Sequence, residues 1–144
     1  MYVFLLPSSA HPAAFKNVLE ELLNAEDEDT LARIITTIQH VADYGGHPHE
    51  PSSRRLKGVD MCEIRSKYHR EELIRIYYYA DKDAGKMLLL NCIIKPDGSN
   101  SASMYEGKSG KKIEKEIQAS IALAVALRVQ YPSTHSDYEP LLPL

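Results

Sequence analysis

The stretch MCEIRSKYHREELIRIYYY, residues 61–79, decides the fold that the sequence predicts. It holds two runs rich in β-branched and aromatic residues, at about 61–66 and 73–80, and a polar segment between them is typical of a turn. A third run of this kind follows at about 87–94. Because only short polar segments join the runs, the sequence favours an antiparallel meander.

Side chains alternate between the two faces of a strand, so the same stretch predicts which residues share a face. One face carries Cys62 and Ile64, together with Ile74, Ile76 and Tyr78 of the next run. These apolar side chains are expected to meet the helices. The opposite face is expected to be partly open, and it receives the remaining side chains: Met61, Glu63, Arg65, Arg75, Tyr77 and Tyr79.

Helical periodicity flanks the predicted strands. A short buried strand is expected at about residues 2–6, and apolar residues then recur at helical spacing through about residue 25 and again over 31–41. A further helix is expected over about 111–130. The predicted fold class is therefore α+β, with an N-terminal helical hairpin packed on one face of a small antiparallel-rich sheet and with a C-terminal helix.

Length and composition set the expected organisation. A chain of 144 residues with 44% hydrophobic content predicts one domain, over residues 1–131, followed by an irregular C-terminal tail at 132–144. Its apolar runs are far shorter than the ~20 residues that cross a bilayer, and the first residues lack the features of a secretory signal. We therefore expect a cytoplasmic protein that does not enter a membrane.

The two cysteines, Cys62 and Cys92, predict no disulfide framework, because they are not in a CxxC arrangement. If one strand lies between theirs, about 9–10 Å separates them, which is too far for a disulfide. Buried, reduced thiols are expected. His47 and His49 form only a pair at i, i+2 with no obvious third ligand, so no metal site is expected.

Charge is unevenly distributed along the chain. The net charge is -6 over residues 1–53, +5 over 54–115 and -2 over 116–144. A basic middle segment can attract a polyanion, and the alternative is an ordinary solvated surface. Arginine and tyrosine on an open sheet face suit RNA, because guanidinium groups bind phosphate and aromatic rings stack on bases. The alternative for that face is an ion pair between Glu63 and an arginine.

Five short motifs occur in an informative order: LKG at 56–58, MCEIR at 61–65, LIRIYYY at 73–79, MLLLNCIIK at 87–95 and KKIEKEI at 111–117. Their order and spacing resemble the RelE/ParE toxin superfamily, and particularly its HigB or phage Gp49-like branch. The resemblance spans roughly residues 13–128. It implies the toxin component of a type II toxin-antitoxin module, and many such toxins are endoribonucleases that cleave mRNA on the ribosome, whereas ParE relatives inhibit DNA gyrase.

The resemblance also implies site residues. Arg75 would bind phosphate and stabilise charge in the transition state of a 2′-hydroxyl attack, and Arg65 would assist it. Lys95 would be an electrostatic or proton-transfer group, and Tyr105 a stacking or acid-base group. The expected RNA-binding residues are Arg54, Arg55, Lys57, Lys67, Arg70, Tyr77 and Tyr79.

The implied partners are a cognate antitoxin and mRNA on the ribosome, or alternatively DNA gyrase, with no cofactor. An antitoxin is expected to cover the open sheet face with an acidic or amphipathic segment. Two positions depart from the family pattern, since Glu63 stands where some ribonuclease members carry lysine and Pro96 follows Lys95 in place of a second basic residue. These departures leave open a non-enzymatic interaction module of the same fold.

Overall fold

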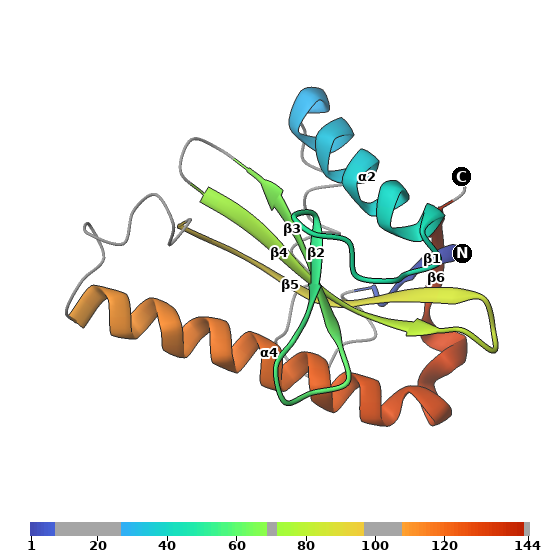
Figure 1. The fold of residues 1–144 in the computed structure, drawn as a ribbon. Coiled ribbons are helices and arrows are strands. Elements are labelled where there is room, and N and C mark those ends of the chain that lie inside the picture. The colour runs from blue at the N-terminus through green and yellow to red at the C-terminus, as the bar shows by residue number, and fades with distance from the viewer. Residues whose placement is uncertain (8–26, 69–71, 97–107, 143–144) are drawn as a thin grey trace.

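The computed structural model describes residues 1–7, 27–68, 72–96 and 108–142. Within these ranges it has an α+β fold in which a mixed six-stranded sheet lies between two long helices (Figure 1). The elements in chain order are β1 (Tyr2–Leu5), α2 (Glu28–Asp43), β2 (Ser53–Arg55), β3 (Cys62–Lys67), β4 (Glu72–Asp81), β5 (Lys86–Pro96), α4 (Lys108–Thr134), the 3₁₀ helix η2 (His135–Asp137) and β6 (Glu139–Leu142).

The sheet has the strand order β2-β3-β4-β5-β1-β6. Strands β3, β4 and β5 form the antiparallel meander that the three apolar runs predicted. The predicted N-terminal strand also joins the sheet, as β1, and it pairs in parallel with β5. Because β4 lies between β3 and β5, the cysteines are separated by one strand as expected, and both are buried thiols outside any disulfide.

Helix α2 packs on the face of the sheet that alternation assigned to the helices. Ile34, Ile38 and Val41 of α2 join Ile64 and Ile76 in one buried apolar cluster. The helix begins after Asp27, whose carboxylate accepts hydrogen bonds from the backbone N–H groups of residues 29 and 30 at 3.2 and 3.3 Å. Such a cap satisfies donors that the first turn leaves unpaired. The first helix of the expected hairpin lies outside the described residues.

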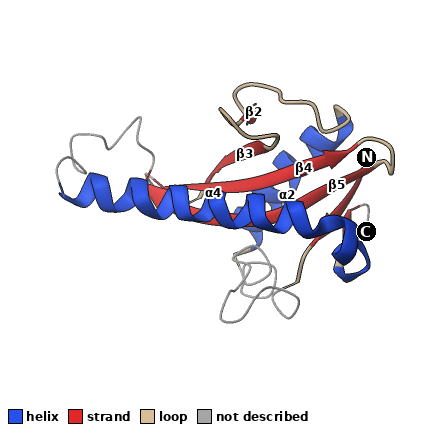
Figure 2. Ribbon diagram, turned by 90° about the horizontal axis from the view of Figure 1, so that it is seen from below, coloured by secondary structure: helices blue, strands red, loops and turns tan. Residues whose placement is uncertain are grey.

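Helix α4 corrects the prediction that all helices share one face. It crosses the opposite side of the sheet, as Figure 2 shows from below. Ala124 and Leu127 of α4 pack with Tyr77, Leu88 and Leu90 in a second buried cluster. The expectation of an open face is therefore wrong along this half of the sheet. The reason is that the apolar stripe of α4 and these strand residues bury each other.

A β-bulge in β5 changes which of its side chains face α4. Tyr77 pairs with Asn91 and Tyr78 with Leu89, so Leu90 is the extra residue. The alternation of faces consequently shifts by one position after Leu90, as is usual at a bulge. The Asn91 side chain can therefore donate hydrogen bonds to the carbonyl and hydroxyl oxygens of Ser120 in α4, at 2.9 and 2.8 Å.

The described part of the expected irregular tail, residues 132–142, is instead largely regular. Helix α4 continues to Thr134, and after η2 the chain forms β6, which pairs antiparallel with β1. Pro140 is compatible with this strand because β6 is the edge of the sheet. Strand β2, at the other edge, was not predicted either. Within the described ranges, no helix combines the length and the apolar content that crossing a membrane requires.

Candidate functional site

Three neighbouring strands bring four charged side chains together on the α4 face. Arg54 of β2 pairs in register with Glu63 of β3, and Arg65 of β3 pairs with Arg75 of β4. Because Glu63, Arg65 and Arg75 alternate with the buried isoleucines of the α2 face, their side chains point to the other side. The sheet register therefore places three guanidinium groups around one carboxylate.

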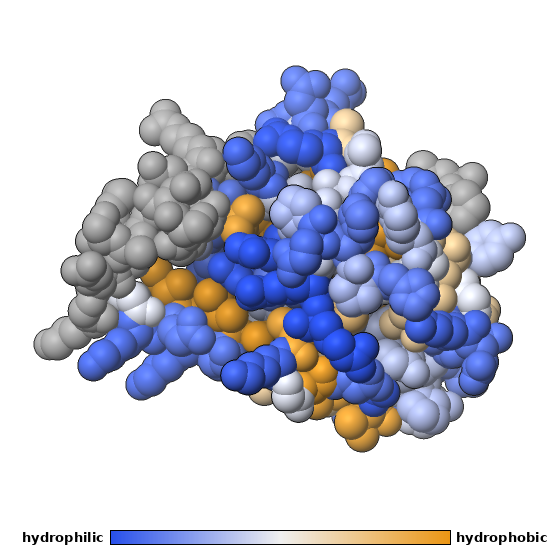
Figure 3. All heavy atoms as spheres, in the orientation of Figure 1, coloured by the Kyte–Doolittle hydropathy of each residue, from blue (hydrophilic) through white to orange (hydrophobic). Residues whose placement is uncertain are grey.

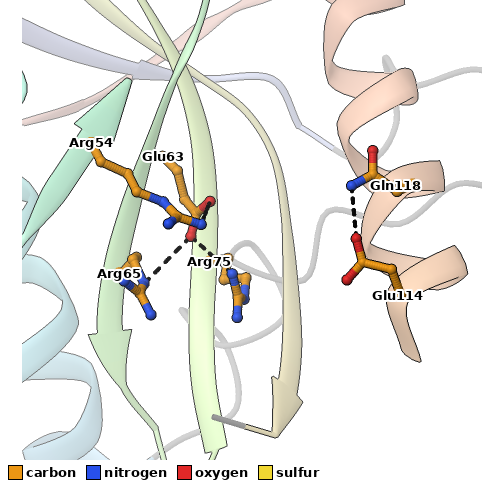
Figure 4. A network of polar contacts seen from close by, with 6 residues as sticks. All are labelled: Arg54, Glu63, Arg65, Arg75, Glu114 and Gln118. Atoms are coloured by element: carbon orange, nitrogen blue, oxygen red, sulfur yellow. Dashed lines mark hydrogen bonds and ion pairs between the residues drawn. The ribbon is translucent and has the colours of Figure 1, made fainter. Parts of the chain in front are cut away.

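Each arginine contacts the Glu63 carboxylate (Figure 4). The Nη1 group of Arg75 donates to Oε1 at 3.2 Å, and the Nη2 group of Arg54 donates to Oε2 at 3.5 Å. The Nε atom of Arg65 lies 3.6 Å from Oε1. We call these four residues the arginine cluster. The ion pair that the sequence left as an alternative for this face is thus present.

The arginine cluster is partly buried, so its ion pairs matter for the stability of the fold. The Glu63 side chain is 1% exposed and that of Arg75 is 11% exposed, whereas those of Arg65 and Arg54 are 28% and 43% exposed. A buried carboxylate is tolerated only when it is paired, and three guanidinium groups pair this one. One negative charge faces three positive charges, so the cluster keeps a surplus of two positive charges.

A cavity of about 500 Å³ opens beside the cluster, between the β2–β3–β4 end of the sheet and α4. We call it the arginine cavity. Its charged wall combines Arg54, Arg55, Lys57 and Arg75 with the carboxylates of Glu63 and Glu114. Four cationic groups against two carboxylates give this lining a net charge of about +2, part of which Asp60 offsets by pairing with Arg55 at 2.7 Å; the whole chain carries -3. The cavity therefore attracts anions to a protein that is otherwise acidic.

The remaining wall of the arginine cavity is largely apolar. It consists of Leu56 and Val59 from the turn between β2 and β3 and of Ile117 and Ile121 from α4, with Gln118 beside them. Figure 3 shows hydrophilic side chains bordering a hydrophobic stripe along α4 on this face of the molecule. Gln118 donates a hydrogen bond to Glu114 at 3.0 Å on the same helix (Figure 4).

Of the four residues expected to be catalytic, the structure brings two together. Arg65 and Arg75 both contact Oε1 of Glu63. Lys95 does not line the arginine cavity and forms an ion pair with Glu116 of α4, which holds the pKa of that carboxyl below its usual value. Tyr105 lies outside the described residues.

The residues expected to bind RNA divide in a similar way. Arg54, Arg55 and Lys57 line the arginine cavity. The prediction for Tyr77 is wrong, because α4 buries it completely; this burial also raises the pKa of its phenol.

Two further predicted RNA-binding residues, Tyr79 and Lys67, do not line the cavity. Tyr79 is half-buried, and the guanidinium carbon of Arg128 lies 4.3 Å from its ring centroid. It is therefore not a free stacking platform. Lys67 is exposed at the end of β3, away from the cavity lining, and Arg70 lies outside the described residues.

Sequence reasoning missed the contribution of α4 to the site. Glu114, Ile117, Gln118 and Ile121 line the arginine cavity, and they recur at the spacing of one helix face. The isoleucine stripe was visible in the sequence. The sheet face against which this stripe packs was not visible, because an apolar stripe alone does not identify the face that it covers.

A second cavity, of about 350 Å³, contains Cys62 but no activated nucleophile among its described residues. Burial raises the pKa of the Cys62 thiol, and a protonated thiol is a poor nucleophile. His49 stacks on Tyr44 with ring centroids 4.4 Å apart. Within the described part of the chain, no group of three or more His, Cys, Asp or Glu side chains could hold a metal ion.

Comparison of the chain with protein-family models, with curated proteins and with solved structures finds no match. The features of this chain that bear on function are therefore the arginine cavity and the order of the sequence motifs.

Proposed function

We propose that this protein binds RNA through its phosphate groups at the arginine cavity, as the toxin component of a type II toxin-antitoxin module. The observation that carries the proposal is the charge surplus of the arginine cluster, in which one carboxylate faces three guanidinium groups. Guanidinium groups bind phosphate oxygens bidentately, and Arg54 is exposed enough to do so. The toxin assignment is supported by the motif order around residues 56–117.

A second candidate function is cleavage of mRNA on the ribosome by 2′-hydroxyl attack. The observation that favours it is the convergence of Arg65 and Arg75 on one carboxylate oxygen, because two guanidinium groups can stabilise the charge that develops on phosphate. Lys95, however, is paired with Glu116. We therefore place binding ahead of cleavage. An interaction module without chemistry, including one directed at DNA gyrase, is the alternative that the test must separate.

An antitoxin that masks this site would contact the cavity lining that β2 and the β2–β3 turn contribute. The expected route over an open sheet face is closed where α4 packs on Tyr77 and Leu88. An acidic segment suits this lining, because Lys57 and Arg55 are both exposed there, and Arg55 also pairs with Asp60 at 2.7 Å.

The test is fluorescence anisotropy with a labelled single-stranded RNA at increasing salt concentration. The variant is Arg54→Gln, and the matched control is Arg33→Gln, an exposed arginine of α2 on the other side of the sheet. Loss of one phosphate contact should reduce the slope of log K against log salt by about 0.7. The control should leave the slope unchanged.

The outcomes separate the candidates. RNA binding that Arg54→Gln weakens supports the proposal, and absence of RNA binding rejects it. Expression without an antitoxin should arrest bacterial growth. If cleavage sites then map within translated mRNA, the endoribonuclease function holds, whereas growth arrest with intact mRNA selects the interaction module.

A further inference from the structure

We infer that the arginine cavity accepts a phosphate monoester carried by a nucleoside, in preference to the phosphodiester of an internal nucleotide. The inference rests on the proposed function, because it names the kind of phosphate that the same site binds. The source can be the terminal phosphate of an RNA strand or a free mononucleotide, which share this chemistry.

The charge of the arginine cluster matches that of a phosphate monoester. The arginine cluster has a surplus of two positive charges while Glu63 stays in place. A phosphate monoester carries about -1.5 to -2 charges at neutral pH, whereas each phosphodiester carries one. Because charges in a partly enclosed site are poorly screened, a ligand that matches the surplus binds better than one that leaves part of it uncompensated.

An unpaired donor of Arg75 also favours a monoester. The Arg75 Nε atom is buried and has no hydrogen-bond partner among the described residues, whereas the Arg65 Nε atom faces Oε1 of Glu63 at 3.6 Å and Arg65 does not line the cavity. Arg75 lies in the cavity wall, and 9% of the residue is exposed. A buried donor without a partner destabilises the protein, so a ligand oxygen that accepts from it binds favourably. A monoester presents three terminal oxygens to such donors.

The volume and the lining of the cavity favour a ligand that carries a nucleoside. Its volume of about 500 Å³ falls within the ~300–1,000 Å³ that is usual for small-molecule sites. Leu56, Val59, Ile117 and Ile121 supply an apolar lining beside the cationic groups. A ligand with an anionic end and a flat, weakly polar body can contact both the cationic and the apolar lining. A nucleotide has these two parts.

The experiment is isothermal titration calorimetry of the full chain with a set of defined ligands. Adenosine 5′-monophosphate presents the monoester and the base, and ribose 5-phosphate presents the monoester alone. The dinucleotide ApA presents a phosphodiester with two bases, and adenosine presents no phosphate. A ribotrinucleotide with a 5′-phosphate and its 5′-hydroxyl counterpart distinguish a strand end from a free nucleotide.

We expect adenosine 5′-monophosphate to bind roughly tenfold or more tightly than ApA, since it adds a charge-assisted hydrogen bond. Ribose 5-phosphate should bind more weakly than the mononucleotide, and adenosine most weakly. Arg54→Gln should reduce the affinity for the mononucleotide about tenfold, whereas Arg33→Gln should not. If the phosphorylated trinucleotide binds like the mononucleotide, the strand end is a ligand; if only the mononucleotide binds, the ligand is a free nucleotide.

Equal affinities for adenosine 5′-monophosphate and ApA overturn the inference, and so does an Arg54→Gln variant that binds the mononucleotide like wild type. If single-stranded RNA still binds in the anisotropy experiment, only the preference for a monoester is lost. If neither RNA nor any of these ligands binds, the proposed function fails as well.

Discussion

The two faces of the sheet are built from the same strands but differ in what they bury. On the α2 face, Ile34, Ile38, Ile64 and Ile76 are each at most 1% exposed and pack only apolar atoms against one another. On the α4 face, the apolar contacts around Tyr77 and Leu88 give way toward β2 to the arginine cluster. Single-residue alternation on β3 and β4 separates a sealed core from a charged cavity, so a stability change and a binding change can be addressed separately.

The largest effect is expected from Glu63→Ala on the α4 face. Removing this carboxylate leaves Arg75 buried without its ion-pair partner, which should lower the free energy of unfolding by about 3–5 kcal/mol. Urea denaturation measures the loss. The double variant Glu63→Leu with Arg75→Leu removes both charges and should recover most of it, because an apolar pair of similar volume is often neutral or stabilising. A cost below ~1 kcal/mol for Glu63→Ala would show that the carboxylate does not organise this face.

On the α2 face, Ile38→Ala should lower the free energy of unfolding by about 2–5 kcal/mol, because it opens a cavity in a fully buried cluster. Thr36→Ala, at an exposed position of the same helix, is the matched control. RNA binding by folded Ile38→Ala should equal that of wild type. A change in RNA affinity would mean that the two faces are coupled through the sheet.

These predictions depend on a face assignment that the sequence already contained. Alternation placed Ile74 and Ile76 against a helix and Arg65 and Arg75 on the other side, because period-2 patterning follows directly from strand geometry. The strand runs and both described helices were also visible as periodic apolar patterns. That α4 covers the second face could not be predicted, since it depends on the path of the chain between β5 and α4.

Short and irregular elements also limited what could be predicted from the sequence. Strand β2 has only the residues Ser53–Arg55, and neither its length nor its composition signals a strand. The bulge at Leu90 shifts the alternation of β5 and so decides which of its later side chains meet α4. Glu63 was recognised as a possible ion-pair partner, but its contact with three arginines required the registers of β2, β3 and β4 together.

Alkaline pH should destabilise the protein through tyrosines on both faces. Burial raises the pKa values of Tyr77, Tyr78 and Tyr138 above that of an unfolded tyrosine, which is near 10. Above that pH the unfolded chain loses protons that the folded protein keeps, so stability is fully present below about pH 10 and falls as pH rises. The fall should approach ~1.4 kcal/mol per pH unit for each tyrosine. Denaturation series at pH 8, 10 and 11 measure it, and equal stability at all three values would contradict the assignment.

The smallest and sharpest comparison uses the neighbouring tyrosines Tyr77 and Tyr78. The Tyr78 hydroxyl donates a hydrogen bond to the carbonyl oxygen of Gly46 at 3.0 Å, whereas the Tyr77 hydroxyl has no hydrogen-bond partner among the described residues. Tyr78→Phe should therefore cost about 0.5–1.5 kcal/mol, and Tyr77→Phe should be neutral or stabilising. Thermal unfolding of both variants provides the measurement. The reverse order would show that the Tyr77 hydroxyl is satisfied and that of Tyr78 is not.

The position of β1 has a consequence for synthesis of the chain. Strand β1 pairs on one side with β5 and on the other with β6, so its hydrogen-bonding partners are residues 86–89 and 139–142. At ~5–20 residues per second, the ribosome completes those partners on the order of ten seconds after β1 has been made. During that interval the apolar strand Tyr2–Leu5 has neither neighbour, and an unpaired strand of this kind is a site for aggregation or for chaperone binding. Pairing of this sheet is therefore completed only when β6 has left the ribosome and pairs with β1.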